Sequence, residues 1–197
     1  MGDTLIPLIL FTFVGSFTPG PNNLMATAAG HAFGLKRSMP QILGVTFGFA
    51  VMIVLFGLGL AQVLAAYPGL HGGLRVIGAF YLLYLAWRIA RAGDPRADEP
   101  MRRPLTFIEA ALFQWLNPKA WTLAVGVVTA FTTSGDALVH ELIVIVVIFA
   151  IMTIATLVVW CLFGIAIRKF MGSERQRRIV NYCMAGALVL SVLMLFV

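Results

Sequence analysis

The sequence predicts an all-α integral membrane protein in which six transmembrane helices form two inverted-topology repeats of three helices each, with helices 1 and 4 broken. Charged residues make up only 11% of the 197-residue chain and its mean hydropathy is +0.95, whereas soluble domains carry roughly 25% charged residues. Apolar runs of about 17 to 30 residues, long enough to cross a bilayer, recur along the whole length. Two proline motifs at matching places in the two halves indicate the repeat and the breaks.

The spanning elements are expected to be helices because the apolar runs are continuous. A membrane β-barrel would instead show segments of about ten residues in which polar and apolar side chains alternate. The first run follows no Lys or Arg and precedes no small-residue cleavage site, so we expect it to be retained rather than removed as a secretory signal. The six predicted spans cover residues 5–29, 39–66, 72–91, 106–132, 138–167 and 179–197.

The basic residues are distributed unevenly between the predicted loops. Of the 14 Lys and Arg residues, twelve lie in or beside the loops after spans 1, 3 and 5. The positive-inside rule places these loops in the cytoplasm and both termini outside. A nucleic-acid partner is not expected, because the cations are spread over three short loops without interleaved aromatic residues, and a solvated face against the lipid bilayer accounts for them. The twelve are Lys36, Arg37, Arg88, Arg91, Arg96, Arg102, Arg103, Arg168, Lys169, Arg175, Arg177 and Arg178.

One long polar segment divides the chain. Residues 92–104 read AGDPRADEPMRRP, and a cytoplasmic linker (95–105) separates a first three-helix repeat (1–94) from a second (106–197). Because three is odd, the second half must enter the membrane from the side opposite to the first, as in an inverted repeat. An offset of 99 residues (118 − 19) superposes the two proline motifs and carries the second predicted span onto most of the fifth.

The proline motifs TPGPNN (residues 18–23) and NPK (residues 117–119) interrupt two strongly apolar runs. Proline cannot donate a backbone hydrogen bond and its ring crowds the preceding turn, so each helix is expected to open there. The freed carbonyls cost several kcal/mol in hydrocarbon unless protein or water pairs them. The breaks are therefore expected to face the bundle or a wet cavity. By helical rise, both lie near mid-depth, roughly 21 Å and 18 Å from opposite faces.

The junction of the two breaks is the predicted binding site. Past the first break the helix is expected to restart at Asn22, where unpaired N–H groups and about half a positive charge favour an anion. A carboxylate would lie against the two half-helix N-termini with Lys119 nearby, and an ammonium would be held by freed carbonyls and by Asn22 or Asn117. A lone proline usually marks only a kink, but paired motifs beside a buried Lys favour a site. The candidate binding residues are Pro19, Gly20, Pro21, Asn22, Asn23, Asn117, Pro118 and Lys119.

Two titratable residues are candidates for proton coupling. Lys119, roughly 19 Å deep, cannot snorkel to either interface and must face protein or water. Glu109 lies about four residues inside the inner face. The alternative for Glu109 is that it pairs with Arg102 or Arg103 at the interface.

Four stretches of the sequence carry a family resemblance: TPGPN in the first span, GLKRSMPQILGVTFGF after it, YLLYLAWR at the end of the third and FQWLNPKAW in the fourth. They resemble the LysE/RhtB family of bacterial amino-acid exporters. The resemblance implies proton-driven export of amino acids or close derivatives, such as homoserine, its lactone, threonine, leucine, lysine or arginine, across the bacterial inner membrane. It chooses no single substrate, implies no cofactor, and indicates a homodimer by analogy only. The residues that match the family pattern are Pro19, Gly20, Pro21, Asn22, Asn117, Pro118 and Lys119.

Three other classes of protein stay open. A divalent metal-ion exporter would need carboxylate, His or Cys ligands at mid-membrane, but the predicted spans contain no Asp and no mid-depth His. An intramembrane enzyme would need a nucleophile and base, or a metal pair, at matched depth, and the sequence indicates none. A structural or assembly protein would have little reason to keep paired helix breaks and a buried cation. Cys161 and Cys183 lack metal-ligand spacing and are interpreted as packing residues.

Other small and polar residues in the spans have weaker interpretations. Gly44 and Gly48 form a GxxxG motif, which more often marks close packing inside one bundle than a dimer interface. His31, His71 and His140 fall at span ends, where interfacial solvation accounts for them. Hydroxyl and amide side chains could line a polar path, although hydroxyls in membrane helices usually bond their own backbone. These candidates are Gln41, Thr46, Gln114, Thr122, Thr153 and Thr156.

Overall fold

The computed structural model describes residues 2–60, 62, 68–91, 103–133 and 135–193, and all regular secondary structure within them is helical. The all-α class predicted from the sequence is therefore confirmed for these residues. Most of the predicted linker, residues 95–102, lies outside them. The helices are α1 (Gly2–Phe17), α2 (Pro21–Phe33), α3 (Leu35–Gly57), α5 (Pro68–Arg91), α6 (Phe107–Phe113), the 3₁₀ turn η1 (Gln114–Leu116), α7 (Pro118–Phe131), α8 (Leu138–Lys169) and α9 (Glu174–Leu193).

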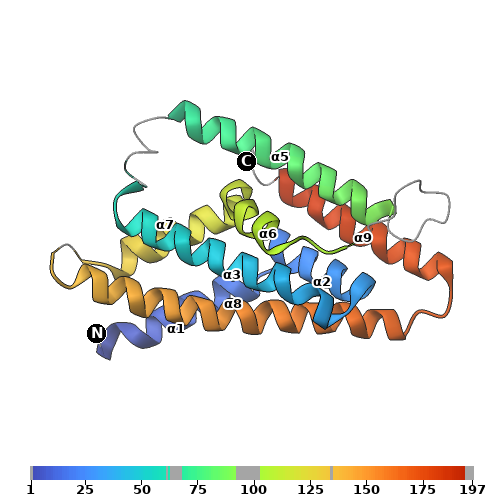
Figure 1. Ribbon diagram of the computed structural model, residues 1–197, viewed down its shortest axis with the longest axis horizontal. Helices are drawn as coiled ribbons and strands as arrows, with labels where there is room; N and C mark the ends of the chain where they lie inside the picture. The colour runs from blue at the N-terminus through green and yellow to red at the C-terminus, as the bar shows by residue number, and fades with distance from the viewer. Residues whose placement is uncertain (1, 61, 63–67, 92–102, 134, 194–197) are drawn as a thin grey trace.

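The helices form an elongated bundle in which the long helices run along its length (Figure 1). The orange α8 extends along one side and packs on α1, α2 and α3, whereas α5 and α9 lie side by side at the other. The short α6 packs on α3, and η1 contacts α5. Elements from the two halves of the chain are thus interleaved throughout the bundle.

Three helical segments are long and apolar enough to cross a membrane, namely Leu35–Gly57, Gly72–Arg91 and Leu138–Lys169, and they correspond to predicted spans 2, 3 and 5. A fourth crossing arises if α1 and α2, which are bent by 55° at their break, count as one span. The fourth predicted span (106–132) is instead divided among α6, η1 and α7. Helix α9 begins at Glu174 with a charged first turn. By length and composition, the described helices account for up to four of the six predicted spans.

The outer surface of the longest helix is apolar. Large side chains of α8 recur there at intervals of four residues, with Val139 63%, Ile143 57%, Val147 50% and Ile151 62% exposed. A water-soluble helix would carry polar side chains on such a face. A continuous apolar strip of this kind is typical of a helix that faces lipid.

Glycines bring helix backbones into direct contact at several crossings. A Cβ added to Gly44 or Gly48 of α3 would collide with backbone carbonyl oxygens of α6. The prediction that this GxxxG motif serves packing inside the bundle is therefore confirmed. Helices α2 and α8 approach each other in the same way through Gly30 and Gly164.

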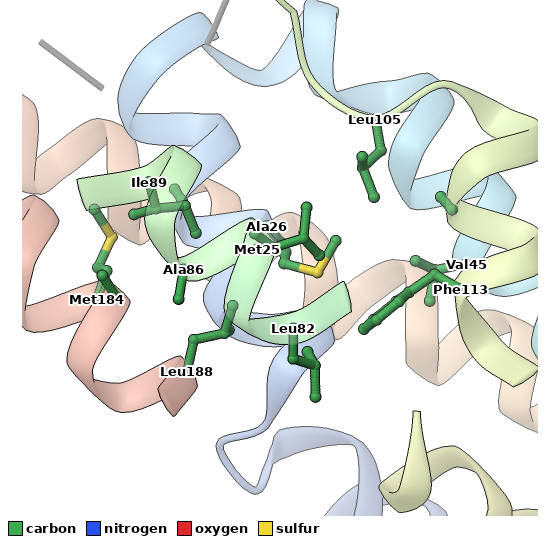
Figure 2. Packing of buried hydrophobic residues seen from close by; sticks show 14 of the residues in the cluster. Met25, Ala26, Val45, Leu82, Ala86, Ile89, Leu105, Phe113, Met184 and Leu188 are labelled. Atoms are coloured by element: carbon green, nitrogen blue, oxygen red, sulfur yellow. The ribbon is translucent and has the colours of Figure 1, made fainter. Parts of the chain in front are cut away.

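Two apolar clusters hold the halves together. The first, shown in Figure 2, joins Leu82 and Ile89 of α5 to Met184 and Leu188 of α9 and extends to α2, α3 and α6. The second joins α3, α7 and α8, and its larger side chains are Phe49, Phe56, Trp121, Ile145 and Phe149. Each cluster contains residues from both halves of the chain. The half-helices that follow the two breaks are anchored in different clusters, α2 in the first and α7 in the second.

Candidate functional site

The first break lies between α1 and α2, where residues 18–20 leave the helix. The side-chain amide of Asn23, which is 4% exposed, donates to the carbonyl oxygens of Ser16 at 2.9 Å and Thr18 at 3.0 Å. Asn23 therefore pairs backbone groups that the break withdraws from helical bonding. The helix resumes at Pro21, one residue earlier than predicted. The fixed φ and the missing N–H of proline suit the first helical position.

The second break is built differently, from a 3₁₀ turn and a capping side chain. The chain tightens from α6 into η1 and leaves the helix at Asn117 (φ −99°, ψ 107°). The Oδ1 atom of Asn117 accepts a hydrogen bond from the backbone N–H of Lys119 at 3.2 Å and so caps α7, in which Pro118 is the first residue. The buried Gln114 side chain donates to the Ala110 carbonyl at 2.9 Å. The backbone groups at this break are thus hydrogen-bonded largely by side chains of the same segment.

Side chains from the two breaks contact one another. The amides of Asn22 and Gln114 form a reciprocal pair with N···O distances of 2.8 and 3.3 Å. The Lys119 ammonium crosses to the first break and donates to the Thr18 carbonyl. Lys119 also lies against Gly20, where an added Cβ would be 2.7 Å from Cδ of Lys119. Because the backbone of Gly20 is extended (φ −173°, ψ 178°) and open to any residue, glycine is needed there for space.

A small cavity, partly open to solvent, lies where the breaks meet. It is polar at the two breaks and largely apolar along α3 and α7. The predicted binding residues that line it are Gly20, Asn22, Asn23, Asn117 and Lys119. The predicted prolines, Pro19, Pro21 and Pro118, are not among the lining residues; they shape the breaks instead. The other lining residues are Gly15, Ser16, Val45, Phe49, Ala120, Leu123, Thr153, Thr156 and Leu157.

Part of this lining was missed by sequence reasoning. The apolar wall and Ser16 belong to ordinary apolar runs that carry no motif. Thr153 and Thr156 were only two of several candidates for a polar path, yet they are three residues apart, a spacing that puts both on one face of a helix. That shared face is the signal that could have selected them. Gln114 lies behind the cavity and contacts it through Asn22.

Glu109 is not among the cavity-lining residues and has partners of its own. Its carboxylate accepts hydrogen bonds from both terminal nitrogens of Arg103, at 2.6 and 2.8 Å. It also completes a capping box with Thr106 at the start of α6. Hydrogen bonding to this carboxylate raises the pKa of the Arg103 guanidinium above its ordinary value. The pairing expected as the alternative is therefore confirmed for Arg103, while a coupling role for Glu109 stays a prediction.

The described residues do not favour a metal-ion exporter. Among them, no group of three or more His, Cys, Asp or Glu side chains could hold a metal ion. The two cysteines are free, with Cys161 buried and Cys183 exposed. The cavity wall instead carries the Lys119 ammonium, which would repel a divalent cation.

Known proteins share this sequence over most of its length. A family model described as LysE type translocator matches residues 13–197. Cysteine/O-acetylserine efflux proteins of Salmonella paratyphi A and Salmonella typhimurium are each 31% identical to the chain over 173 residues, which cover 86% of this chain and 87% of those proteins. The protein of that name from Escherichia coli O1:K1 is 27% identical over 172 residues, with the same two coverages. No solved structure matches the chain.

These matches confirm the family resemblance of the four sequence motifs. They also confirm a membrane transporter, as opposed to an enzyme, as the class of protein. Because the family model spans nearly the whole chain and the relatives at 31% identity align over 86% of it, the chain belongs to the LysE type translocators.

Proposed function

We propose that this protein is a secondary-active transporter that exports amino acids or close derivatives from the bacterial cytoplasm across the inner membrane, driven by the proton-motive force. The observation that carries the proposal is the cavity at the junction of the two helix breaks, with Lys119 on its wall. The translocator family and the names of the relatives support efflux of small amino-acid solutes of the cysteine or O-acetylserine kind. The proposal includes no cofactor.

The substrate carboxylate would bind at Lys119. This ammonium donates to the Thr18 carbonyl, and a carboxylate is a stronger acceptor for a cation than a neutral carbonyl. The first turn of α2 is adjacent, since Gly20 is both its N-cap residue and a neighbour of Lys119. Gly20 has no side chain to cap α2, so the N–H groups of that turn can bind an anion. The substrate ammonium would contact backbone carbonyls of the first break and the amide oxygen of Asn22 or Asn117.

Six spans in an inverted repeat are part of the same proposal. Exchanging the two halves maps α1, α2, α3 and α5 onto α6 with η1, α7, α8 and α9, respectively. Under this exchange, the pair α2 and α8 corresponds to the pair α7 and α3, and both pairs are in contact. The pair α3 and α6 likewise corresponds to the pair α8 and α1, and both of these are in contact too. The contacts of α3 with α8 and of α5 with α9 map onto themselves. The contacts of α5 with η1, of α2 with α9 and of α1 with α7 have no comparable counterparts among the described residues, so the main helix–helix contacts carry the support for a pseudo-two-fold arrangement.

The starts of the two half-helices support the same axis. Helices α2 and α7 both begin with proline, Pro21 and Pro118, so the structure aligns their N-cap residues Gly20 and Asn117 at an offset of 97 (117 − 20 = 97). Both N-cap residues line the cavity. The cavity would then lie at the centre of the repeat, and rocking of the halves would open it to each side in turn.

Topology and coupling complete the proposal. Both termini and the loop containing Asp136 face outward, and the three basic loops face the cytoplasm. Coupling involves Lys119, which lines the cavity, with Glu109 as the second candidate, and a homodimer is proposed by family analogy. Single-cysteine labelling in a cysteine-free background tests the topology. An impermeant reagent applied to intact cells should label position 136 and spare position 98, and labelling of position 98 would overturn both the topology and the inverted repeat.

Counterflow in proteoliposomes tests the transport activity. Vesicles containing the purified protein are loaded with one unlabelled amino acid, and uptake of the labelled compound is compared with protein-free vesicles. Homoserine, threonine, cysteine, leucine and lysine form the panel, with Mn²⁺ and Zn²⁺ in a parallel arm. We expect exchange of at least one amino acid and net transport that responds to a proton gradient. Transport of a metal ion without any amino acid would contradict the proposal and support a metal-ion exporter.

A further inference from the structure

Thr156, in the second half of α8, has a buried hydroxyl without a hydrogen-bond partner. The residue is 1% exposed, it lines the cavity at the helix breaks, and its Oγ1 atom bonds to no other group. Three other buried helical threonines behave differently: Thr12, Thr27 and Thr46 each bond the carbonyl four residues back, at 2.7 to 2.9 Å. Thr156 therefore lacks the usual partner of a threonine in a membrane helix.

An unpaired buried hydroxyl destabilises a fold, because the group has lost its water and gained nothing in return. Valine has nearly the same shape as threonine and would fill the same space without this cost. A hydroxyl can both donate and accept a hydrogen bond. A polar ligand in the cavity would supply the missing partner, and this gives the hydroxyl of Thr156 a function.

The charges on the cavity wall set a second condition for the ligand. Among the described residues that line the cavity, Lys119 is the one charged side chain, and none is Asp or Glu. If Lys119 binds the substrate carboxylate, a cationic side chain on the substrate would add a positive charge with no carboxylate to pair it. An uncharged side chain avoids this penalty. The space inside the cavity for the centres of water-sized molecules is only about 50 Å³, which favours a short side chain.

We infer that Thr156 binds the side chain of the substrate and makes the transporter selective for amino acids with short, uncharged, hydrogen-bonding side chains. The inference rests on the proposed function and deepens it. Lys119 of α7 holds the carboxylate, and Thr156 of α8 binds the polar group at the other end of the substrate. Thr153, on the same face of α8 and on the same cavity wall, extends this polar surface.

Homoserine and 2-aminobutyrate isolate this contact, because they differ by a single hydroxyl. Counterflow of each is measured with the wild-type protein, Thr156→Val, Thr156→Ser and the matched control Thr46→Val, whose hydroxyl already bonds the Ile42 carbonyl at 2.9 Å. We expect the wild type to prefer homoserine by about 3- to 10-fold, the worth of one neutral hydrogen bond. Thr156→Val should lose this preference, whereas Thr156→Ser and Thr46→Val should keep it. Lysine should exchange at least about tenfold more slowly than homoserine.

Thermal unfolding in detergent adds a readout that a structural role would not produce. Thr156→Val removes an unpaired hydroxyl and should have a Tm equal to or above that of the wild type, whereas Thr46→Val breaks an existing bond and should have a lower one. Equal exchange of homoserine and 2-aminobutyrate by the wild type, or equal slowing of both by Thr156→Val, would overturn the inference and leave amino-acid export intact. Failure of the wild type to exchange any amino acid would overturn the proposed function itself.

Discussion

The two helix breaks pair their freed backbone groups in different ways. At the second break, Gln114 and Asn117 bond backbone groups of their own segment. At the first break, the Thr18 carbonyl is bonded by Asn23 from the following helix and by Lys119 from the other half of the chain. The second break is therefore closed by its own residues, whereas the first depends on a side chain of the second.

This difference assigns separate tasks to the two halves. Helices α2 and α7 both begin with proline, so Gly20 and Asn117 are matching N-cap residues and Lys119 corresponds to Asn22. The first half therefore has an amide where the second has a long cationic side chain. Lysines at both positions would bring two repelling charges to one cavity, and asparagines at both would leave no charge for an anion. The first break, which lacks a cap of its own, is the part expected to rearrange when substrate takes Lys119 away from Thr18.

Replacing Lys119, whose ammonium reaches from the second break to the first, has the largest expected effect. Lys119→Met keeps the length of the side chain and should reduce counterflow at matched protein content by about 10- to 100-fold, because a charged hydrogen bond to the substrate is lost. Membrane abundance should be unchanged or higher, since a Lys in the middle of a span costs about 2.5 to 3.5 kcal/mol on insertion. Lys119→Arg should be partly active, because a guanidinium differs in shape and hydration.

A purely structural Lys119 would give a different result. If its bond to Thr18 only fixes the first break, Lys119→Met should lower protein abundance and leave transport per molecule normal. Wild-type counterflow by Lys119→Met would remove Lys119 from the site and would show that the two breaks do not differ in function.

Adding a side chain at Gly20 should have the next largest effect on export. Gly20→Val would place a Cβ 2.7 Å from Cδ of Lys119 and should reduce export by about tenfold, because the ammonium is displaced from its place in the cavity. Abundance should stay near that of the wild type, since the extended backbone accepts any residue and the Lys119 side chain can move. Gly186→Ala in α9, where an added Cβ meets open space, is the matched control. Normal export by Gly20→Val would show that the first break is only a kink.

The asymmetry of pairing predicts a difference in stability. Asn23→Ala leaves the Ser16 and Thr18 carbonyls without a side-chain amide and should lower the free energy of unfolding by about 2 kcal/mol. Asn117→Ala removes one helix cap and should lower it by about 1 kcal/mol. Thermal unfolding of both variants in detergent without substrate compares them directly. Equal losses, or a larger loss for Asn117→Ala, would contradict the difference in backbone pairing between the two breaks.

The sequence was sufficient to predict where the breaks lie, though not what closes them. A lone proline does not decide this, since Pro7 and Pro40 lie inside α1 and α3. The interruptions after Phe17 and before Pro118 follow from proline combined with Gly20 in the first motif and with the capping residue Asn117 in the second. Their partners come from far along the chain: the Asn22–Gln114 pair spans 92 residues and the contact of Lys119 with Thr18 spans 101. No local pattern encodes such contacts.

The spans were predictable where one helix makes the whole crossing. Predicted spans 2, 3 and 5 correspond to single long helices, because hydropathy averaged over about 20 residues detects a continuous apolar run. The fourth run is apolar from 106 to 132 yet folds as α6, η1 and α7. Hydropathy does not register a turn inside an apolar run, so only the NPK motif indicated this division.

The smallest expected effect is at Glu109, which lies outside both breaks. Its carboxylate is held by Arg103 and by the backbone N–H of Thr106, and none of these three residues lines the cavity. Binding a proton would require Glu109 to give up an ion pair on the surface of the protein, and such pairs contribute little to stability. Glu109→Gln keeps the shape of the side chain and an acceptor for Thr106.

We therefore expect counterflow by Glu109→Gln to stay within about twofold of the wild type, with the same response of net transport to an imposed proton gradient. Arg103→Gln should behave alike, because it breaks the same pair from the other side. One result would contradict this expectation: Glu109→Gln shows normal counterflow, but its net transport no longer responds to the proton gradient. Exchange without coupling would identify Glu109 as the proton carrier, and coupling would then depend on the cap of α6 rather than on the charge that Lys119 brings to the two breaks.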